Sequence, residues 1–194
     1  MSWVYLIVIL TISIASQTQR FLLAFAFGFK GETGTVQEDN ATYEISTAYP
    51  QLVPMIGVVS GAMFALPLSI TGIFVGVMVS SVNRKWMLCI GCIVWSLFTF
   101  LQGYIDSFPV FCILRSLMGI AMSVCNPLAY SLIRDYFPPS KRATANSLYS
   151  SAIYVGNALA SLNIIYIKEY GWRYGYMTVG LFGVALAFLG ILVI

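Results

Sequence analysis

Six long apolar stretches, separated by short polar breaks, constrain this 194-residue chain more than any other feature. Each holds roughly 20 residues or more, which is the length that an α-helix needs to cross the hydrocarbon core of a bilayer. None has the alternating pattern of a barrel strand, and a helix satisfies its own backbone groups where water is absent. We therefore predict an all-α membrane protein, a single six-transmembrane-helix bundle over 1–194, with spans at about 3–29, 49–80, 86–105, 109–133, 143–167 and 174–194.

The composition supports the same conclusion and excludes other classes of protein. Hydrophobic residues make up 59% of the chain and charged residues 9%, which is far too little charge to cover the surface of a soluble domain. The net charge of +3 is scattered, whereas a nucleic-acid interface needs a clustered basic face, so no nucleic-acid partner is expected. The lipid bilayer is the expected environment.

Catalytic and metal sites are not expected either. The chain contains no His, which excludes an HExxH zinc site, a Ser-His dyad and bis-histidine haem ligation. We predict no enzyme, no cofactor and no metal. Four cysteines lie inside apolar runs and are interpreted as packing residues, although two of them match C-x-x-C by letter: Cys89, Cys92, Cys112 and Cys125.

The first apolar run has a rival interpretation as a signal peptide, because 3–16 has the length of a signal-peptide core. It lacks a basic segment before it, and its apolar character continues to Phe29. We therefore expect a retained first helix.

Basic residues in the breaks predict the orientation. Five follow the second and fourth spans, whereas the other side carries a mixture of acids and bases. The positive-inside rule then places both termini in the cytoplasm, in a plasma membrane or an endomembrane. Asn40-Ala41-Thr42 is a sequon in a loop on the opposite side, so Asn40 is expected to be glycosylated. The five basic residues are Arg84, Lys85, Arg134, Lys141 and Arg142.

Small residues and prolines inside the spans predict how the helices meet and bend. Rows of small residues let helix backbones approach closely, and a proline within a helix removes one backbone donor. We expect close packing at Gly57, Gly61, Gly72 and Gly76 in the second span and at Ala152, Gly156 and Ala160 in the fifth. We expect kinks near Pro54, Pro67 and Pro127.

Five short motifs occur in the order found in one known family. They are Gln19-Arg20-Phe21; the 76–85 loop ending in Asn83-Arg84-Lys85; Arg115-x-x-x-Gly119; Arg134-Asp135-Tyr136-Phe137-Pro138-Pro139-x-x-Arg142-x-x-Ala145; and Gly171-Trp172-Arg173. This set resembles the N-terminal half of the major facilitator superfamily and is most similar to spinster-type transporters. The resemblance implies a twelve-helix fold with a substrate cavity between two six-helix halves. The expected partner is therefore a missing C-terminal six-helix half or, if the protein is naturally half-size, a second copy.

The chain also departs from the family pattern. Acidic positions of the family are occupied here by Ser80, Gln19 and Met122, and Ser81 stands for an arginine. The family associates those carboxylates with charge networks and proton coupling, so the resemblance does not imply proton-driven transport here. The segment Gly156-Asn157-Ala158 lacks the proline motif of drug/proton antiporters.

Polar groups inside spans are the candidate substrate-binding residues. A central arginine costs about 2.5–3.5 kcal/mol on insertion scales, so Arg20 and Arg115 need a reason to be there. They predict a cationic cavity wall and an anionic or zwitterionic small molecule or lysolipid as substrate. The alternative is a structural role, in which each arginine pairs with backbone carbonyls or with an acid of the absent half. Weaker candidates, which could equally be interhelical hydrogen bonders, are Gln19, Asn126, Tyr130 and Tyr154.

The residues at the ends of the second to fifth spans form a candidate gate against a second half, with positive-inside topology as the alternative explanation. They are Ser80, Arg84, Lys85, Asp135 and Arg142. The function predicted from the whole set is transmembrane transport of a small solute by alternating access. The alternative is a non-transporting membrane scaffold or receptor derived from a transporter fold.

Overall fold

A computed structural model describes residues 2–28, 45–79 and 81–193, and all regular structure in these ranges is helical. This confirms the all-α fold class. The helices are α1 (Ser2–Gly28), α3 (Ile45–Ala48), α4 (Leu52–Gly57), the π-helix η1 (Val58–Ala62), α5 (Met63–Met78), α6 (Arg84–Tyr104), α7 (Phe108–Met122), α8 (Cys125–Tyr136), α9 (Pro139–Tyr170) and α10 (Trp172–Val193).

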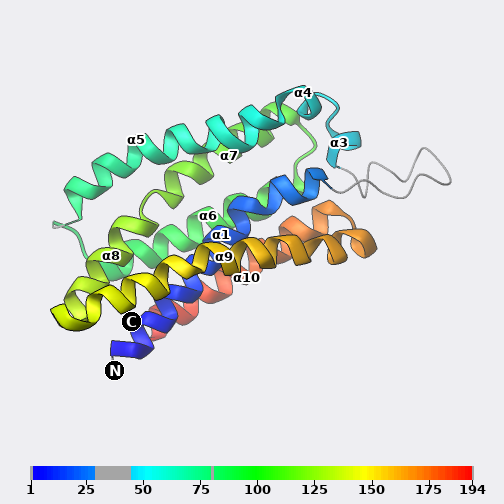
Figure 1. The fold of residues 1–194 in the computed structure, drawn as a ribbon. Helices are drawn as coiled ribbons and strands as arrows, with labels where there is room; N and C mark the ends of the chain where they lie inside the picture. Colours follow the sequence, from blue (N-terminus) through cyan, green and yellow to red (C-terminus); the bar gives the residue numbers. More distant parts are fainter. Residues whose placement is uncertain (1, 29–44, 80, 194) are drawn as a thin grey trace.

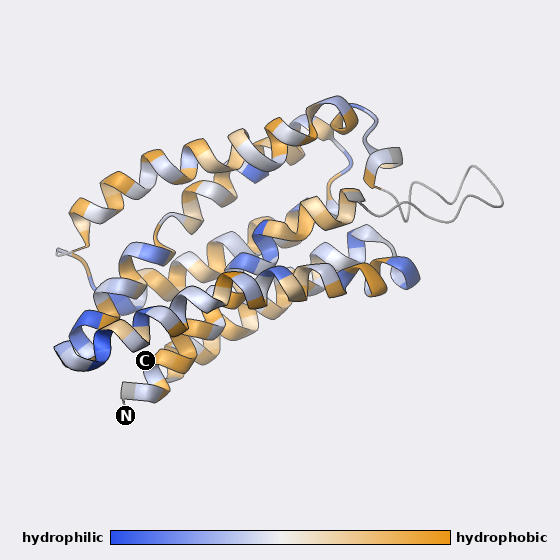
Figure 2. Cartoon of the chain, viewed as in Figure 1, coloured by the Kyte–Doolittle hydropathy of each residue, from blue (hydrophilic) through white to orange (hydrophobic). Residues whose placement is uncertain are grey.

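Six helical units within the described residues have the length and apolar composition to cross a membrane. α4, η1 and α5 together make one such unit, and α7 with α8 makes another. Apolar residues cover most of the helix lengths, and hydrophilic residues gather toward the ends of the bundle (Figure 2). The chain is therefore a multi-pass integral membrane protein.

α9 extends beyond its expected 143–167 limits at both ends, and the sequence gives the reason. Pro139 lies in the first turn, where its missing N–H has no helical acceptor to lose. Gly171 ends the helix with a positive φ of 91°, a conformation that favours glycine. The two residues therefore set the start and the end of the longest helix.

The helices form one bundle in which α1 packs against α9 and α10, α6 packs against α10 and α7, and α5 packs against α7 (Figure 1). α1 begins and α10 ends at the same end of this bundle (Figure 1). Ala152, Gly156 and Ala160 of α9 are all buried, and a Cβ on Gly156 would lie 2.5 Å from the Gln17 Cβ of α1. The prediction of close packing in the fifth span is confirmed.

Within the described residues, the second span does not show the same close packing. A Cβ added at any of its four glycines would meet no atom within 4 Å, so no described side chain covers them: Gly57, Gly61, Gly72 and Gly76. This span instead meets α7 through a glycine on the partner helix, Gly119. Small residues permit a close approach but do not by themselves specify which surface of a helix is used.

Two of the three expected proline effects coincide with irregular backbone. η1 begins four residues after Pro54, and α7 ends just before Ser123, four residues ahead of Pro127. A proline cannot donate to the carbonyl four residues before it, so Pro127 leaves the Ser123 carbonyl without its usual helical donor. The fourth span is therefore two helices joined at Ser123 and Val124.

An aromatic cluster holds the start of the second span at the end of the bundle opposite the two termini (Figure 1). The Tyr49 ring lies 5.5 Å from the ring of Phe111 and 5.7 Å from that of Trp172, centroid to centroid. Its hydroxyl donates to the Ile105 carbonyl, and burial raises the pKa of Tyr49, so the phenol stays protonated as a donor. This fixes the chain between α3 and α4 against α6, α7 and α10.

Candidate functional site

Arg20 of α1 and Arg115 of α7 lie against the same aromatic ring, that of Phe64 in α5. The guanidinium carbons are 5.4 Å and 5.1 Å from the ring centroid. Both distances are within the range of cation–π interactions. The two arginines, separated by 95 residues in the chain, therefore lie at the same depth, and we call them with Phe64 the arginine–phenylalanine cluster.

Gly119 explains how α5 brings Phe64 to Arg115. Gly119 follows Arg115 by four residues, so it lies one turn further along α7 on the same side. A Cβ on Gly119 would lie 2.5 Å from the Phe64 carbonyl oxygen. Only the absence of a side chain lets the two backbones come this close, and this contact places the Phe64 ring beside the guanidinium.

Arg115 is almost completely buried, with 1% of its surface exposed. Its Nη2 donates to the Arg20 carbonyl over 2.7 Å, its Nη1 lies 3.7 Å from the Met118 Sδ, and its Nε has no partner. The carbonyl contact is of the kind that the structural alternative requires. No described carboxylate forms an ion pair with this guanidinium.

Arg20 is half-buried. Its guanidinium lies 5.5 Å from the Phe21 ring centroid, in addition to its contact with Phe64. The Arg20 guanidinium has no hydrogen bond or ion pair with another part of the described chain, although the Arg20 carbonyl accepts from Arg115. The arginine–phenylalanine cluster thus carries two positive charges for which the described residues supply no acid.

Gln19 is fully buried between three helices. Its Nε2 donates to Ser96 Oγ of α6 and to the Val179 carbonyl of α10, each over 3.2 Å, and its Oε1 accepts from Thr99 Oγ1 over 3.2 Å. Gly183 makes room, since a Cβ there would lie 2.3 Å from both Gln19 Nε2 and Ser96 Oγ. Gln19 therefore uses its amide to join α1, α6 and α10.

Asn126 and Tyr130 belong to a second polar cluster, between α8 and α9. Tyr149 donates its hydroxyl to Asn126 Oδ1 over 2.9 Å, and its ring packs edge-on against Tyr130 at 5.1 Å. Asn126 lies in α8, eleven residues after Arg115 and beyond the break at Ser123 and Val124 that ends α7. The structure thus does not bring this cluster to the arginines, and Tyr154, 78% exposed, lies in neither group.

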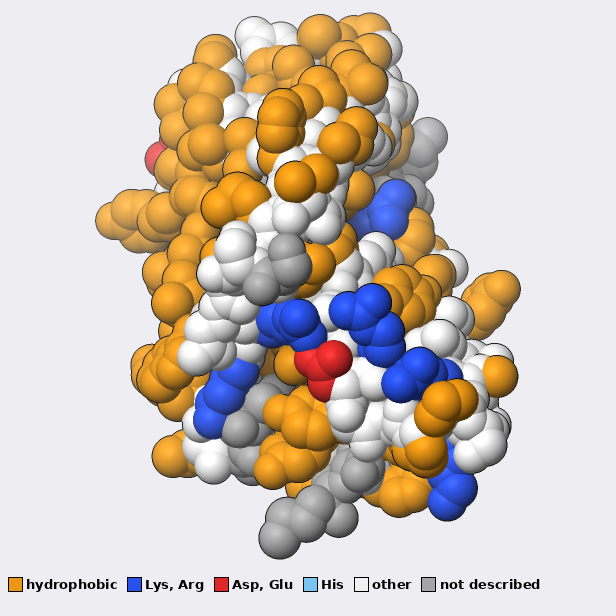
Figure 3. Space-filling model, turned by 90° about the vertical axis from the view of Figure 1, so that its left-hand side faces the viewer, with side chains coloured by type: hydrophobic (Ala, Val, Ile, Leu, Met, Phe, Trp, Pro, Cys, Tyr) orange, Lys and Arg blue, Asp and Glu red, His pale blue; other side chains and the backbone are white. Residues whose placement is uncertain are grey.

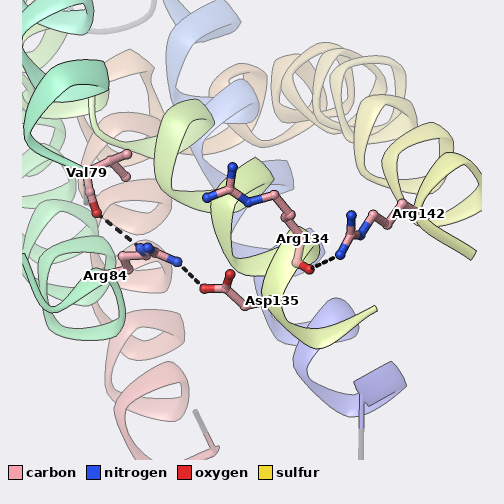
Figure 4. A network of polar contacts seen from close by, with 5 residues as sticks. All are labelled: Val79, Arg84, Arg134, Asp135 and Arg142. Atoms are coloured by element: carbon pink, nitrogen blue, oxygen red, sulfur yellow. Dashed lines mark hydrogen bonds and ion pairs between the residues drawn. The ribbon is translucent and has the colours of Figure 1, made fainter. Parts of the chain in front are cut away.

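The candidate gate residues lie at the basic end of the bundle, which we define by Arg84, Lys85, Arg134, Lys141 and Arg142. Lysine and arginine side chains surround acidic atoms on this face (Figure 3). Arg84 at the start of α6 forms an ion pair with Asp135 near the end of α8 and donates from Nε to the Val79 carbonyl over 3.1 Å (Figure 4). Two of the candidate gate residues, Arg84 and Asp135, are therefore brought together and tie α6 to α8.

Arg142 donates hydrogen bonds to carbonyls at the end of α8 and pairs with no described carboxylate. Its Nε donates to the Phe137 carbonyl over 3.0 Å. Its Nη2 donates to the Arg134 carbonyl, also over 3.0 Å (Figure 4). A cation beside the last carbonyls of a helix is favoured by the helix dipole. Ser80 and the sequon residue Asn40 lie outside the described residues.

The sequence interpretation missed Phe64 and the polar side chains of α6 that surround the site. Phe64 is one apolar residue in an apolar span and gives no signal of its own. Ser96, Thr99 and Gln102 recur every three residues in an otherwise apolar helix, and this spacing predicts a polar stripe on one face. That signal was available.

Comparisons with known proteins agree with the fold. A sequence profile described as Major Facilitator Superfamily matches residues 2–194. Protein spinster homolog 1 of Xenopus tropicalis is 28% identical over 155 residues, which cover 79% of this chain and 26% of that protein. The probable galactarate/D-glucarate transporter GarP of Escherichia coli (strain K12) is 32% identical over 104 residues, covering 50% of this chain and 23% of that protein.

A solved structure shows the same arrangement of helices. It is a bacterial homologue of the human lysosomal transporter Spinster in an inward-facing, occupied conformation, with a TM-score of 0.72 at 22% sequence identity. The match covers 97% of this chain and 43% of the solved chain. This chain thus spans less than half the length of that structure and about a quarter of each curated relative.

Proposed function

The chain belongs to the major facilitator superfamily, and on this premise we propose that it is one six-helix half of a transporter for a small anionic or zwitterionic organic solute. Transport by alternating access requires a second bundle, against which this one rocks around a central site. The second bundle is the missing C-terminal half or a second copy of this chain. The solute class is inferred from the arginine–phenylalanine cluster.

The single observation that supports this proposal is that two guanidiniums share the Phe64 ring without a described acid between them. Like charges repel more strongly where water is excluded, so an anion between them lowers the free energy of the pair. Ionisable residues held within membrane spans commonly mark a substrate pathway. The relative named as a probable galactarate/D-glucarate transporter is named for organic anions, which supports the same class.

A non-transporting scaffold or receptor is the second candidate, favoured by the environment of Gln19. Where the family has an acid, this chain has a neutral amide whose donor and acceptor atoms already bond to Ser96, Thr99 and Val179. Such a cluster ties helices together and has no proton to exchange at neutral pH. Solute uptake by the full-length protein discriminates between the two functions.

The test is uptake of labelled D-glucarate by the full-length protein in liposomes. Arg20→Gln and Arg115→Gln are each expected to reduce uptake at least about tenfold, corresponding to about 1.4 kcal/mol of lost binding free energy. Arg173→Gln is the matched control, because Arg173 is paired with Asp106 away from the cluster. Unchanged uptake in both cluster variants, or a loss fully explained by less folded protein on size-exclusion chromatography, contradicts the proposal.

A further inference from the structure

Met118 stands at the centre of a buried polar group behind the arginine–phenylalanine cluster. Its sulfur lies 3.5 Å from Gln102 Nε2 and 3.7 Å from Arg115 Nη1. Thr99 Oγ1 is also 3.7 Å away but has oxygen acceptors nearer at hand on Trp95 and Gln19. All of these side chains are almost fully buried within the described bundle.

The sulfur is therefore the acceptor toward which an amide and a guanidinium are both directed. A thioether is a weak acceptor compared with a carbonyl or a carboxylate, but it is polarisable. Arg115 Nε and Gln102 Oε1 are buried without a hydrogen-bond partner. The described structure thus holds the guanidinium through one carbonyl, one sulfur and the Phe64 ring, and no described carboxylate pairs with its positive charge.

We infer that Met118 is a positioning residue for Arg115: its thioether holds the guanidinium in place without neutralising it, and so preserves its attraction for an anionic substrate. The substrate part of this inference rests on the proposed function. Oxygen at this position would compete with the substrate for the same N–H groups, whereas a purely aliphatic side chain would leave the guanidinium to the Arg20 carbonyl and the Phe64 ring alone.

Two substitutions of similar size separate these effects. In Met118→Gln the new carbonyl accepts from Arg115 Nη1, and the new amide can donate to the unpaired Gln102 Oε1. In Met118→Leu neither contact exists. Met122→Gln is the matched control, because Met122 is a buried methionine one turn further along α7 whose sulfur receives no hydrogen bond from a described residue.

The experiment measures D-glucarate binding and thermal unfolding of the full-length protein. Met118→Gln is expected to bind about tenfold more weakly than wild type, because a satisfied guanidinium has less to gain from the ligand. It is also expected to unfold at a temperature at least as high as wild type. Met118→Leu keeps only the Arg20 carbonyl and the Phe64 ring around the guanidinium, so it is expected to bind about threefold more weakly than wild type and to unfold at a lower temperature. Met122→Gln is expected to unfold at a lower temperature with unchanged affinity.

The two readouts distinguish the possible failures. If Met118→Gln unfolds at a temperature as low as that of Met122→Gln, the proposed role of Met118 is overturned. The role is also overturned if Met118→Gln binds D-glucarate with the affinity of the wild type. The unfolding order needs no substrate and therefore decides the role of Met118 by itself. A wild-type protein that binds no D-glucarate, with the unfolding order as expected, supports the positioning of Arg115 and contradicts only the proposed function.

Discussion

Gly119 lies so close to Phe64 that a methyl group on Gly119 would be 2.5 Å from the Phe64 carbonyl oxygen. We therefore predict that Gly119→Ala forces α5 away from α7 and moves the Phe64 ring off Arg115. Overpacking a close backbone contact typically costs about 1–3 kcal/mol. A lower unfolding temperature and weaker substrate binding by the full-length protein are expected together, since the same contact holds the helices and positions the ring.

The second span supplies a control for this substitution. Gly72 has open space where its Cβ would be, so Gly72→Ala meets no described atom. Alanine is the better helix former by about 1 kcal/mol, and this variant should be no less stable than wild type. If the two alanine variants behaved alike, the close contact at Gly119 would not be what holds α5 to α7.

A second prediction concerns the amide that joins α1, α6 and α10. Gln19→Leu removes both donors and the acceptor that Ser96, Val179 and Thr99 use. Interhelical hydrogen bonds in membrane proteins contribute on average about 0.6 kcal/mol each, so a loss of about 1–2 kcal/mol is expected in reversible unfolding. Ser151→Ala is the comparison, because its hydroxyl donates only to Leu148 on its own helix and should change little.

A third prediction concerns the ion pair at the basic end. Arg84 and Asp135 are partly exposed, with 22% and 47% of their side chains accessible, and an exposed pair is worth about 0.2–1 kcal/mol. A double-mutant cycle with Arg84→Gln and Asp135→Asn should give a coupling energy of this size at low salt. The coupling should shrink as salt is raised, because screening acts on exposed charges. Absence of coupling at low salt would mean that the pair does not tie α6 to α8.

The fold was predictable because its determinants are local and repetitive. Apolar length alone identified six spans, but it placed the fifth at 143–167 and did not predict the limits that Pro139 and Gly171 give to α9. The site was less accessible to the same reasoning. Arg20 and Arg115 stand out by their cost in lipid, but Phe64 and Met118 carry no charge, and their importance arises only from the elements packed against them.

The glycines of the second span also show how far sequence reasoning reaches. Their spacing suits a close helix contact, yet the described bundle leaves them uncovered and uses Gly119 instead. A pattern of small residues states what a helix surface permits, whereas which neighbour occupies it depends on the whole arrangement. Sequence spacing therefore predicted the close contact in the fifth span, whereas the described bundle shows none at the glycines of the second span.

The last prediction concerns orientation. The cations of the basic end follow the second and fourth spans, and we expect this end to be cytoplasmic, which places both termini there as well. Lys141→Cys should therefore resist an impermeant thiol reagent on intact cells and react after permeabilisation, while Asn40 on the opposite side carries a glycan in a eukaryotic host. The four native cysteines are all buried, so they should contribute little background labelling. Labelling of position 141 on intact cells, with Asn40 unglycosylated, would reverse the orientation and place the Arg84–Asp135 pair outside the cell or in the lumen.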